Sequence, residues 1–188
     1  LQLIGEDVLV TRDPKEILAA DKVVLPGVGS FGDAMENLHH FGLVPVIHQV
    51  VQEQTPFLGI CLGLQLLFEK SEESPGVEGL GILKGEILRI PAAEGLKIPH
   101  MGWNNIRFPN KGRLFAGVPE DAYVYFVHSY YLKAQDEKIV TATTEYGTHI
   151  HASVESGNLF ACQFHPEKSS HVGLQILKNF AKLQGGNA

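Results

Sequence analysis

The first half of the chain alternates short apolar runs with stretches of helical periodicity. The apolar runs predict strands at residues 7–10, 22–25 and 56–60, and the periodic stretches predict helices at residues 14–19, 32–42 and 45–54. Strands that alternate with helices in this order indicate a parallel sheet covered by helices. The opening residues 1–5 have the pattern of a helix end with a glycine cap, so we expect an opening strand and most of a first helix to be missing from this sequence.

After Pro75 the pattern changes to short β-type segments separated by turn residues. These segments are predicted at residues 81–90, 123–127, 139–144, 149–154 and 159–164. A helix at residues 173–183 is expected to close the fold. Residues 1–188 are therefore predicted to form one α/β domain with a mixed, mostly parallel sheet and an additional small antiparallel β region.

The composition indicates a globular protein and argues against some kinds of partner. A hydrophobic content of 44% and a mean hydropathy of +0.02 are typical of a globular chain in water. The net charge of −6, without any basic run, argues against nucleic acid or an anionic membrane as a partner. Two cysteines far apart make no disulfide framework, so we expect a cytoplasmic protein with free thiols.

Cys61 lies between two glycines at the junction of an apolar run and a helical run. In the related G-x-S-x-G turn, small residues allow a sharp strand-to-helix turn that exposes the nucleophile, and Gly59 and Gly63 occupy the same places here. The helix N-terminus favours thiolate over thiol. The pentapeptide alone is also compatible with a buried structural cysteine.

A second motif, Phe164-His165-Pro166-Glu167, supplies a candidate base. Proline restricts the residue before it to extended conformations, so His165 and Glu167 are expected to project from one side of a non-helical segment. Glu167 would then orient the imidazole while His165 transfers the proton. A surface turn at the end of a strand is the alternative interpretation, and the presence of both motifs favours a catalytic one.

The glycine-rich stretch at residues 26–32 follows a predicted strand and opens a helix. It lacks the Walker lysine and the spacing of a dinucleotide fingerprint, so an oxyanion hole fits better than a nucleotide site. The N–H groups of Val28 and Leu62 are the expected donors to a tetrahedral oxygen. An ordinary strand-to-helix turn remains the alternative.

No metal or cofactor is expected. None of the nine histidines has the spacing of a zinc site, and His149 and His151 are interpreted as exposed residues on one face of a strand. Cys162 lies three residues before His165 on an extended run, so the two side chains point to opposite faces. We therefore interpret Cys162 as a cysteine of the strand core.

These motifs together resemble class I, triad-type glutamine amidotransferases over essentially the whole chain. The elbow and the His-Pro-Glu segment are shared by all class I relatives. Three further stretches resemble the histidine-pathway members, the glutaminase subunits of imidazole glycerol phosphate synthases: residues 26–32, residues 99–104 and residues 167–169. Members usually open with a strand and an Asp-Tyr-Gly-like turn, which is absent here. The resemblance implies a flavodoxin-like fold.

The resemblance also implies roles for individual residues. Cys61 would attack the side-chain amide of glutamine, His165 would protonate the departing ammonia, and water would cleave the γ-glutamyl thioester. The implied contacts to the α-amino-acid end of the substrate are Gly29, Gln65, Ser129 and Tyr130. For Gln65 an exposed helix residue is the plain alternative, and Tyr125 and Ser129 also fit a half-buried strand.

The chain has no site that would accept the ammonia, so the resemblance implies a second polypeptide, a (β/α)8 cyclase subunit. The candidate docking residues are His100, Met101, Trp103, Tyr125 and Lys168, although a sole tryptophan also fits a core. Glycines on both sides of Val28 ease a peptide flip. We hypothesise that the oxyanion hole stays incomplete until the partner binds its ligand.

Other functions share parts of this pattern. A stand-alone γ-glutamyl hydrolase would use the same elbow and base without a partner. The glutaminases of pyridoxal phosphate, anthranilate and aminodeoxychorismate synthesis lack the Pro-His-Met-Gly-Trp-Asn run. A catalytically silent α/β binding module would leave Cys61 unlabelled by a glutamine-mimicking electrophile.

Overall fold

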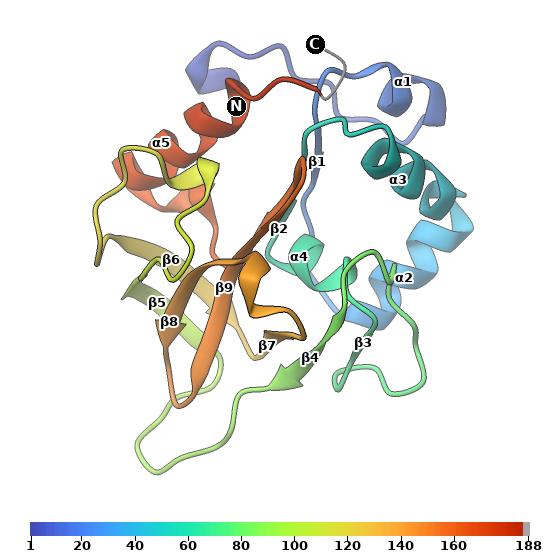
Figure 1. Ribbon diagram of the computed structural model, residues 1–188. Coiled ribbons are helices and arrows are strands. Elements are labelled where there is room, and N and C mark those ends of the chain that lie inside the picture. Colours follow the sequence, from blue (N-terminus) through green and yellow to red (C-terminus); the bar gives the residue numbers. More distant parts are fainter. Residues whose placement is uncertain (186–188) are drawn as a thin grey trace.

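The computed structural model describes residues 1–185, so the last three residues of the predicted domain lie outside the described part. The described residues form an eight-stranded mixed sheet and a separate antiparallel pair of strands (Figure 1). Helices lie on both sides of the large sheet, with α2 and α3 on one side and α5 on the other (Figure 1). The predicted α/β class and the small antiparallel region are confirmed.

The helices and strands follow one another along the whole described chain. The α-helices are α1 (Pro14–Ala19), α2 (Phe31–His40), α3 (Leu43–Gln52), α4 (Leu62–Leu66) and α5 (Ser170–Ala181). The 3-10 helices are η1 (Gln2–Ile4), η2 (Arg113–Phe115), η3 (Glu137–Ile139) and η4 (Pro166–Lys168). The strands are β1 (Val23–Leu25), β2 (Phe57–Ile60), β3 (Lys70–Ser71), β4 (Gly85–Arg89), β5 (His100–Asn105), β6 (Tyr123–His128), β7 (Tyr130–Ala134), β8 (Val140–Glu145), β9 (His149–Ser156) and β10 (Leu159–Cys162).

The large sheet has the strand order β1-β2-β10-β9-β7-β4-β3, and β8 pairs with β9 outside this path. Strands β1, β2 and β10 run parallel, whereas β9 pairs antiparallel with β10, β7 and β8. Strands β5 and β6 form the second sheet, with His100 opposite His128 and Trp103 opposite Tyr125. The parallel part of the large sheet leads directly into the turn that carries Cys61.

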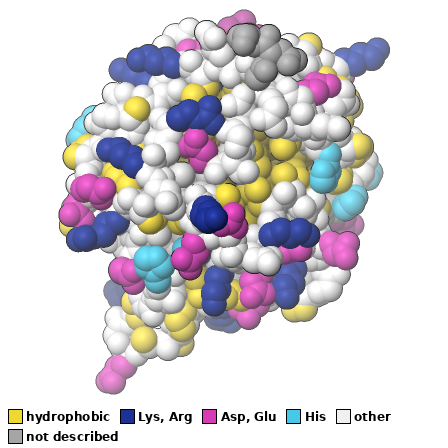
Figure 2. Space-filling view, viewed as in Figure 1, with side chains coloured by type: hydrophobic (Ala, Val, Ile, Leu, Met, Phe, Trp, Pro, Cys, Tyr) yellow, Lys and Arg dark blue, Asp and Glu magenta, His cyan; other side chains and the backbone are white. Residues whose placement is uncertain are grey.

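Two hydrophobic cores cover the two faces of the sheet. Every residue of β2 and β10 is buried, as expected for parallel strands between helical layers. Phe57 and Leu159 pack into the core under α2 and α3, whereas Leu58 and Phe160 pack into the core under α5. Figure 2 shows acidic and basic side chains interspersed around a patch of hydrophobic ones beside α3 and β1.

Local sequence explains where the first helices begin. Asp13 caps α1 by accepting a hydrogen bond from the backbone N–H of Lys15, and Pro14 occupies the first helical position. Ser30 caps α2 in the same way, accepting from the N–H of Asp33. The cap at Ser30 fixes the end of the glycine-rich loop, which bears on the site below.

Some predicted elements are wrong. Residues 7–10 form no strand, because Leu9 and Val10 are 66% and 95% exposed and have no neighbouring strand. Strand β5 was not predicted, since its Gly102 has φ +131° and only pairing with β6 organises it. Every helix in the described residues 1–185 is too short or too polar to span a lipid bilayer.

Candidate active site

The nucleophile turn has the backbone that the glycine spacing predicts. Cys61 follows β2 and caps α4 with φ +55° and ψ −109°, a conformation that non-glycine residues rarely adopt. A Cβ atom at Gly59 would lie 2.7 Å from the carbonyl oxygen of Gly63, and one at Gly63 would lie 1.9 Å from that of Leu25. Both glycines are therefore required by close backbone contacts. A strained residue at such a turn costs about 1–3 kcal/mol and is typical of functional sites.

His165 lies against the cysteine, as the two motifs predicted. The pKa of His165 is raised to about 9, first by its hydrogen bond with Cys61 and then by its hydrogen bond with Glu167. The distance between Nδ1 of His165 and Oε1 of Glu167 is 2.7 Å. His165 is 5% exposed, so this ion pair is shielded from water on the histidine side.

The segment that carries the base differs from the prediction in one respect. His165 itself is extended, with φ −100° and ψ 99°, but Pro166 begins the 3-10 helix η4 instead of continuing an extended run. Proline fits the first helical position because it has no N–H to leave unbonded. The tight turn still brings the Glu167 carboxylate back to His165.

Strand β6 holds both halves of this pair through its backbone. The carbonyl oxygen of Tyr125 accepts from the N–H of His165 at 2.9 Å. The carbonyl oxygen of Val127 lies 3.9 Å from Sγ of Cys61. Ser169 braces the same place, because its hydroxyl accepts from the N–H of Tyr125 and donates to the carbonyl of His165.

Two buried glutamines connect the thiol to the start of β7. Nε2 of Gln163 lies 3.7 Å from Sγ of Cys61, and Oε1 of Gln163 accepts from Nε2 of Gln65 at 3.0 Å. Nε2 of Gln65 also donates to the carbonyl oxygen of Tyr130 at 3.0 Å. Gln163 was not predicted, although a glutamine within the apolar run at residues 159–164 is the signal that marks it.

The predicted oxyanion loop packs against the nucleophile turn. A Cβ atom at Gly27 would lie 2.9 Å from Cβ of Leu62, so the loop and α4 are in contact. Gly29 has φ +94°, and the Val28 side chain is 86% exposed. A pocket of about 360 Å³ is lined by this loop, α2, Leu62 and Leu66, and neither Cys61 nor His165 is among its lining residues.

Two residues that follow β3 anchor the far end of the loop, and neither was predicted. The Glu73 carboxylate accepts from the N–H of Phe31 at 2.8 Å, and the Ser74 hydroxyl accepts from the N–H of Gly32 at 2.9 Å. A carboxylate at a helix N-terminus satisfies a free N–H and complements the helix dipole. The Glu-Glu-Ser run between two predicted segments carried no pattern from which this contact could be read.

Ser129 and Tyr130 lie where β6 ends and β7 begins. Both are half-buried, and the carbonyl of Ser129 accepts from the N–H of Ile90 at 2.9 Å. The carbonyl of Tyr130 accepts from Gln65, as described above, and is also 2.9 Å from Nδ1 of His128. The structure therefore brings Gln65 and Tyr130 into contact, and Gln163 links this pair to Cys61.

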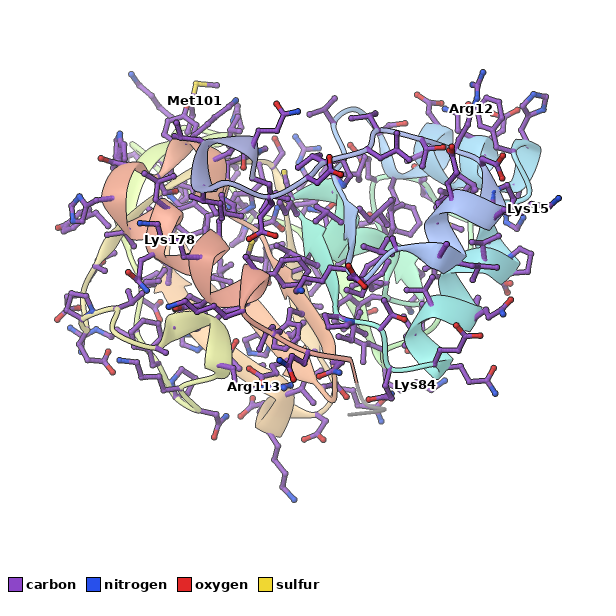
Figure 3. All side chains as sticks on the ribbon, turned by 90° about the horizontal axis from the view of Figure 1, so that it is seen from above. Arg12, Lys15, Lys84, Met101, Arg113 and Lys178 are labelled. Atoms are coloured by element: carbon purple, nitrogen blue, oxygen red, sulfur yellow. The ribbon has the colours of Figure 1, made fainter. Side chains whose placement is uncertain are left out.

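The outer face of the β5–β6 ribbon carries a cluster that we call the outer patch: Met101, Trp103, Tyr123, Tyr125 and Lys168. Met101, Trp103 and Tyr123 are 63%, 52% and 58% exposed. The Trp103 and Tyr125 rings meet edge to face at 6.1 Å, and Nζ of Lys168 lies 5.9 Å from the Tyr125 ring. Figure 3 shows Met101 pointing away from the molecule.

His100 does not belong to this surface, contrary to its predicted docking role. It is 3% exposed and lies on the inner face of β5, between the rings of Phe126 and Tyr146. The alternation of a strand explains the error, because adjacent residues such as His100 and Met101 point to opposite faces. A sequence motif does not show which face each member takes.

The remaining cysteine and histidine predictions have mixed outcomes. Cys162 is fully buried in β10, and burial raises the pKa of its thiol, which confirms the strand-core interpretation. The prediction that His149 and His151 are both exposed is wrong for His151, which is 7% exposed and accepts from the N–H of Ala134. Within residues 1–185, no group of three or more possible metal ligands comes together.

Comparison with known proteins agrees with this geometry. The sequence profile of the family described as Glutamine amidotransferase class-I matches residues 6–183. The solved structure of a glutamine amidotransferase superimposes with a TM-score of 0.71 at 18% identity, covering 96% of this chain and 89% of that one. The glutaminase domain of Trypanosoma brucei CTPS superimposes with a TM-score of 0.62 at 19% identity, covering 90% of this chain and 74% of that one. At these identities the two structures show a shared fold.

Several proteins have a much higher sequence identity to this chain than those two structures have. Imidazole glycerol phosphate synthase subunit HisH from Moorella thermoacetica is 56% identical over 190 residues, which cover 100% of this chain and 90% of that protein. The proteins of the same name from Methanocaldococcus jannaschii and Bacillus subtilis are 47% and 48% identical, over 95% and 97% of this chain and 88% of each relative. The chain therefore belongs to the class I glutamine amidotransferases, within the group of imidazole glycerol phosphate synthase HisH subunits.

Proposed function

We propose that this chain hydrolyses glutamine to glutamate and ammonia and passes the ammonia to a (β/α)8 cyclase subunit. The cyclase would use the ammonia to make imidazole glycerol phosphate and aminoimidazole carboxamide ribotide in histidine biosynthesis. One observation carries the first half of the proposal. Cys61 has a strained backbone at a strand-to-helix turn and contacts His165, which in turn is paired with Glu167.

The proposed reaction begins with attack of the Cys61 sulfur on the side-chain amide carbon of glutamine. The carbonyl oxygen becomes negatively charged, and the N–H groups of Val28 and Leu62 are the proposed donors to it. Such a donor is worth about 3–4 kcal/mol in the transition state. His165 then gives its proton to the amide nitrogen, the carbon–nitrogen bond breaks, and ammonia leaves a γ-glutamyl thioester on Cys61.

Water completes the proposed cycle. Neutral His165 takes a proton from the water that attacks the thioester carbon, and the carbon–sulfur bond breaks to release glutamate and the Cys61 sulfur. Glu167 keeps Nδ1 of His165 occupied, so that Nε2 is the nitrogen that exchanges protons in both halves. Gly29, Gln65, Ser129 and Tyr130 are the proposed contacts for the α-amino-acid end of glutamine.

The outer patch is the proposed docking surface for the cyclase. The Tyr125 ring lies beside both Trp103 and Lys168 there, and tryptophan and tyrosine are enriched at binding hot spots. The relatives are named as subunits of a synthase, and ammonia in neutral water is mostly protonated, which favours direct transfer to a partner. We place this complex in the cytoplasm, where the Cys61 thiol would stay reduced.

We further propose that the partner completes the oxyanion hole. Gly29 has φ +94° with open space around its Cα, and the Val28 side chain is exposed, so a peptide flip beside Val28 meets little obstruction. The isolated chain would then release glutamate slowly, and the complex with nucleotide ligand would release it faster. Full turnover by the isolated chain would contradict this step.

The main test compares Cys61→Ala with a matched control, Cys162→Ala. Glutamate release is measured with the cyclase subunit and its nucleotide ligand present. We expect Cys61→Ala to lose at least about a thousandfold in kcat, and the control to keep its activity. A glutamine-mimicking chloroketone should add one label to the wild type and none to Cys61→Ala. Turnover by Cys61→Ala, or labelling elsewhere, would overturn the proposal.

A further inference from the structure

Two buried histidines lie on the inner face of the β5–β6 ribbon, and the reaction above uses neither. Nδ1 of His100 is 3.0 Å from Nε2 of His128, and Nδ1 of His128 is 2.9 Å from the carbonyl oxygen of Tyr130. Nε2 of His100 faces Nδ2 of Asn104 at 3.4 Å. His100 and His128 are 3% and 6% exposed. Such a buried polar chain is unusual enough to require a reason.

The partners at the two ends determine the direction of every hydrogen bond in this chain. A carbonyl oxygen only accepts, so Nδ1 of His128 must carry the proton, and Nε2 of a neutral ring is then an acceptor. His100 must therefore donate from Nδ1, and its Nε2 accepts from the amide of Asn104. Nδ2 of Asn104 also donates to the carbonyl of Glu145 at 3.0 Å, which fixes the orientation of this amide.

The surroundings keep both rings neutral. Phe126 and Tyr146 stack on His100 with centroid distances of 4.7 and 3.9 Å. Burial lowers the pKa of His100 to about 4, and burial, together with the charges of His100 and His165, lowers the pKa of His128 to about 3 despite its hydrogen bond to Tyr130. A second proton on either ring would also place two donors face to face within the chain.

This series of hydrogen bonds, from His100 through His128 and the Tyr130 carbonyl, ends at Gln65, a residue of the proposed substrate site. The carbonyl oxygen of Tyr130 accepts from both His128 and Nε2 of Gln65. Because a backbone carbonyl cannot donate, the Gln65 amide must place its nitrogen there, and the same nitrogen also donates to Gln163. Both side-chain hydrogen bonds of Gln65 thus use Nε2, and Oε1 is the atom left to face a ligand.

We propose that His128, held by His100, is a positioning residue that fixes the Tyr130 carbonyl and, through it, the Gln65 amide, so that Gln65 presents Oε1 to the α-ammonium group of an amino-acid substrate. The inference rests on the proposed glutaminase function, which supplies that ammonium group. His128 suits this task because its bond to Tyr130 spans the junction between β6 and β7, where only Ser129 intervenes.

The kinetic test is a double-mutant cycle on the complex with the cyclase subunit. We expect His128→Leu to raise the KM for glutamine about three- to tenfold, the effect of one hydrogen bond, with kcat changed less than twofold. In a Gln65→Ala background, His128→Leu should raise KM no further. His128→Asn retains a donor near Nδ1 and should restore most of the wild-type KM.

The control is His151→Leu. It also removes a buried imidazole with one backbone hydrogen bond, from the N–H of Ala134, but His151 is not part of the series of hydrogen bonds that leads to Gln65. It should leave KM unchanged. An unchanged KM in active His128→Leu, or an equal rise in both backgrounds, would overturn the positioning role. If the wild-type complex released no glutamate, the proposed function would fail instead, and the substrate role of Gln65 with it.

A spectroscopic test needs no variant and no activity. Nitrogen-15 spectra of the imidazoles at neutral pH should show both His100 and His128 as neutral rings protonated at Nδ1, the less common tautomer. This measurement tests the hydrogen-bond directions even if the His128→Leu protein fails to fold. A ring protonated at Nε2, or a charged ring, would contradict the hydrogen-bond directions from which the proposal follows.

Discussion

Replacing Gly63 by alanine tests the nucleophile turn directly. The added Cβ would lie 1.9 Å from the carbonyl oxygen of Leu25, whereas real Cβ contacts shorter than 3.0 Å are essentially never observed. The two segments must therefore separate by about 1 Å, and both are backbone, which cannot rotate away as a side chain does. Overpacking of this kind costs about 1–3 kcal/mol, and a shift of about 1 Å at a reacting group costs about a hundredfold in rate.

Two measurements follow, the kcat/KM for glutamate release by the complex and the thermal midpoint of the isolated chain. At about 2–4 °C per kcal/mol for a protein of this size, a cost of about 1–3 kcal/mol should lower the midpoint by roughly 2–12 °C. The kcat/KM should fall about a hundredfold. Since a protein that is still folded at the assay temperature loses no activity through unfolding, a loss of about a hundredfold in kcat/KM would then report the displaced Cys61.

The matched control is Gly5→Ala. Gly5 has φ +90° and nothing within 4 Å of a built Cβ, so alanine adds backbone strain without a clash and far from the site. We expect a loss of about 1–2 kcal/mol in stability and full activity. If Gly63→Ala kept its activity within threefold, or if Gly5→Ala lost as much activity, the argument from close backbone contact would be refuted.

Three further predictions concern charge and surface. In nuclear magnetic resonance titrations His165 should titrate near pH 9, and Glu167→Gln should lower this pKa because it removes one of the two groups that raise it; an unchanged pKa would refute this. The pKa values of His100 and His128, about 4 and about 3, lie below the unfolded value of 6.5, so the unfolded chain binds protons first and the free energy of unfolding should decrease as the pH falls from 6.5 towards 4. Urea titrations should show this slope reduced in His128→Leu by up to about 1.4 kcal/mol per pH unit, and equal slopes would count against buried neutral rings. Trp103→Ala should weaken binding of the cyclase subunit by at least about thirtyfold in calorimetry, and unchanged affinity would exclude the outer patch as the docking surface.

Much of the fold was predictable from the sequence because local and global signals agree there. Asp13 and Pro14 mark the start of α1, and the structure begins that helix at Pro14. The apolar runs at residues 56–60 and 159–164 predicted strands, and the structure has β2 and β10 there, both fully buried. The glycine spacing around Cys61 predicted a sharp turn, and the positive φ of Cys61 confirms it.

The elements that were missed depend on partners distant in the sequence. The two-residue β3 exists only because it pairs with β4, and β5 only because it pairs with β6. The network of Gln163 and His128 joins residues far apart in the chain through single polar atoms, which leave no periodic signal. The predicted docking role of His100 failed for a related reason, since a motif of consecutive residues spans both faces of a strand.

The backbone of β6 has a consequence for how changes at the surface reach the chemistry. The same strand serves both the surface and the site. The Tyr125 ring packs against Trp103 in the outer patch, whereas the backbone carbonyl of Tyr125 contacts His165 and that of Val127 contacts Cys61. A change in the twist of this ribbon would therefore act on the backbone groups that hold both the base and the thiol. Substitutions on the outward side of the ribbon are therefore expected to change the rate of glutamate release as well as the affinity for the partner, so that selection on one property also acts on the other.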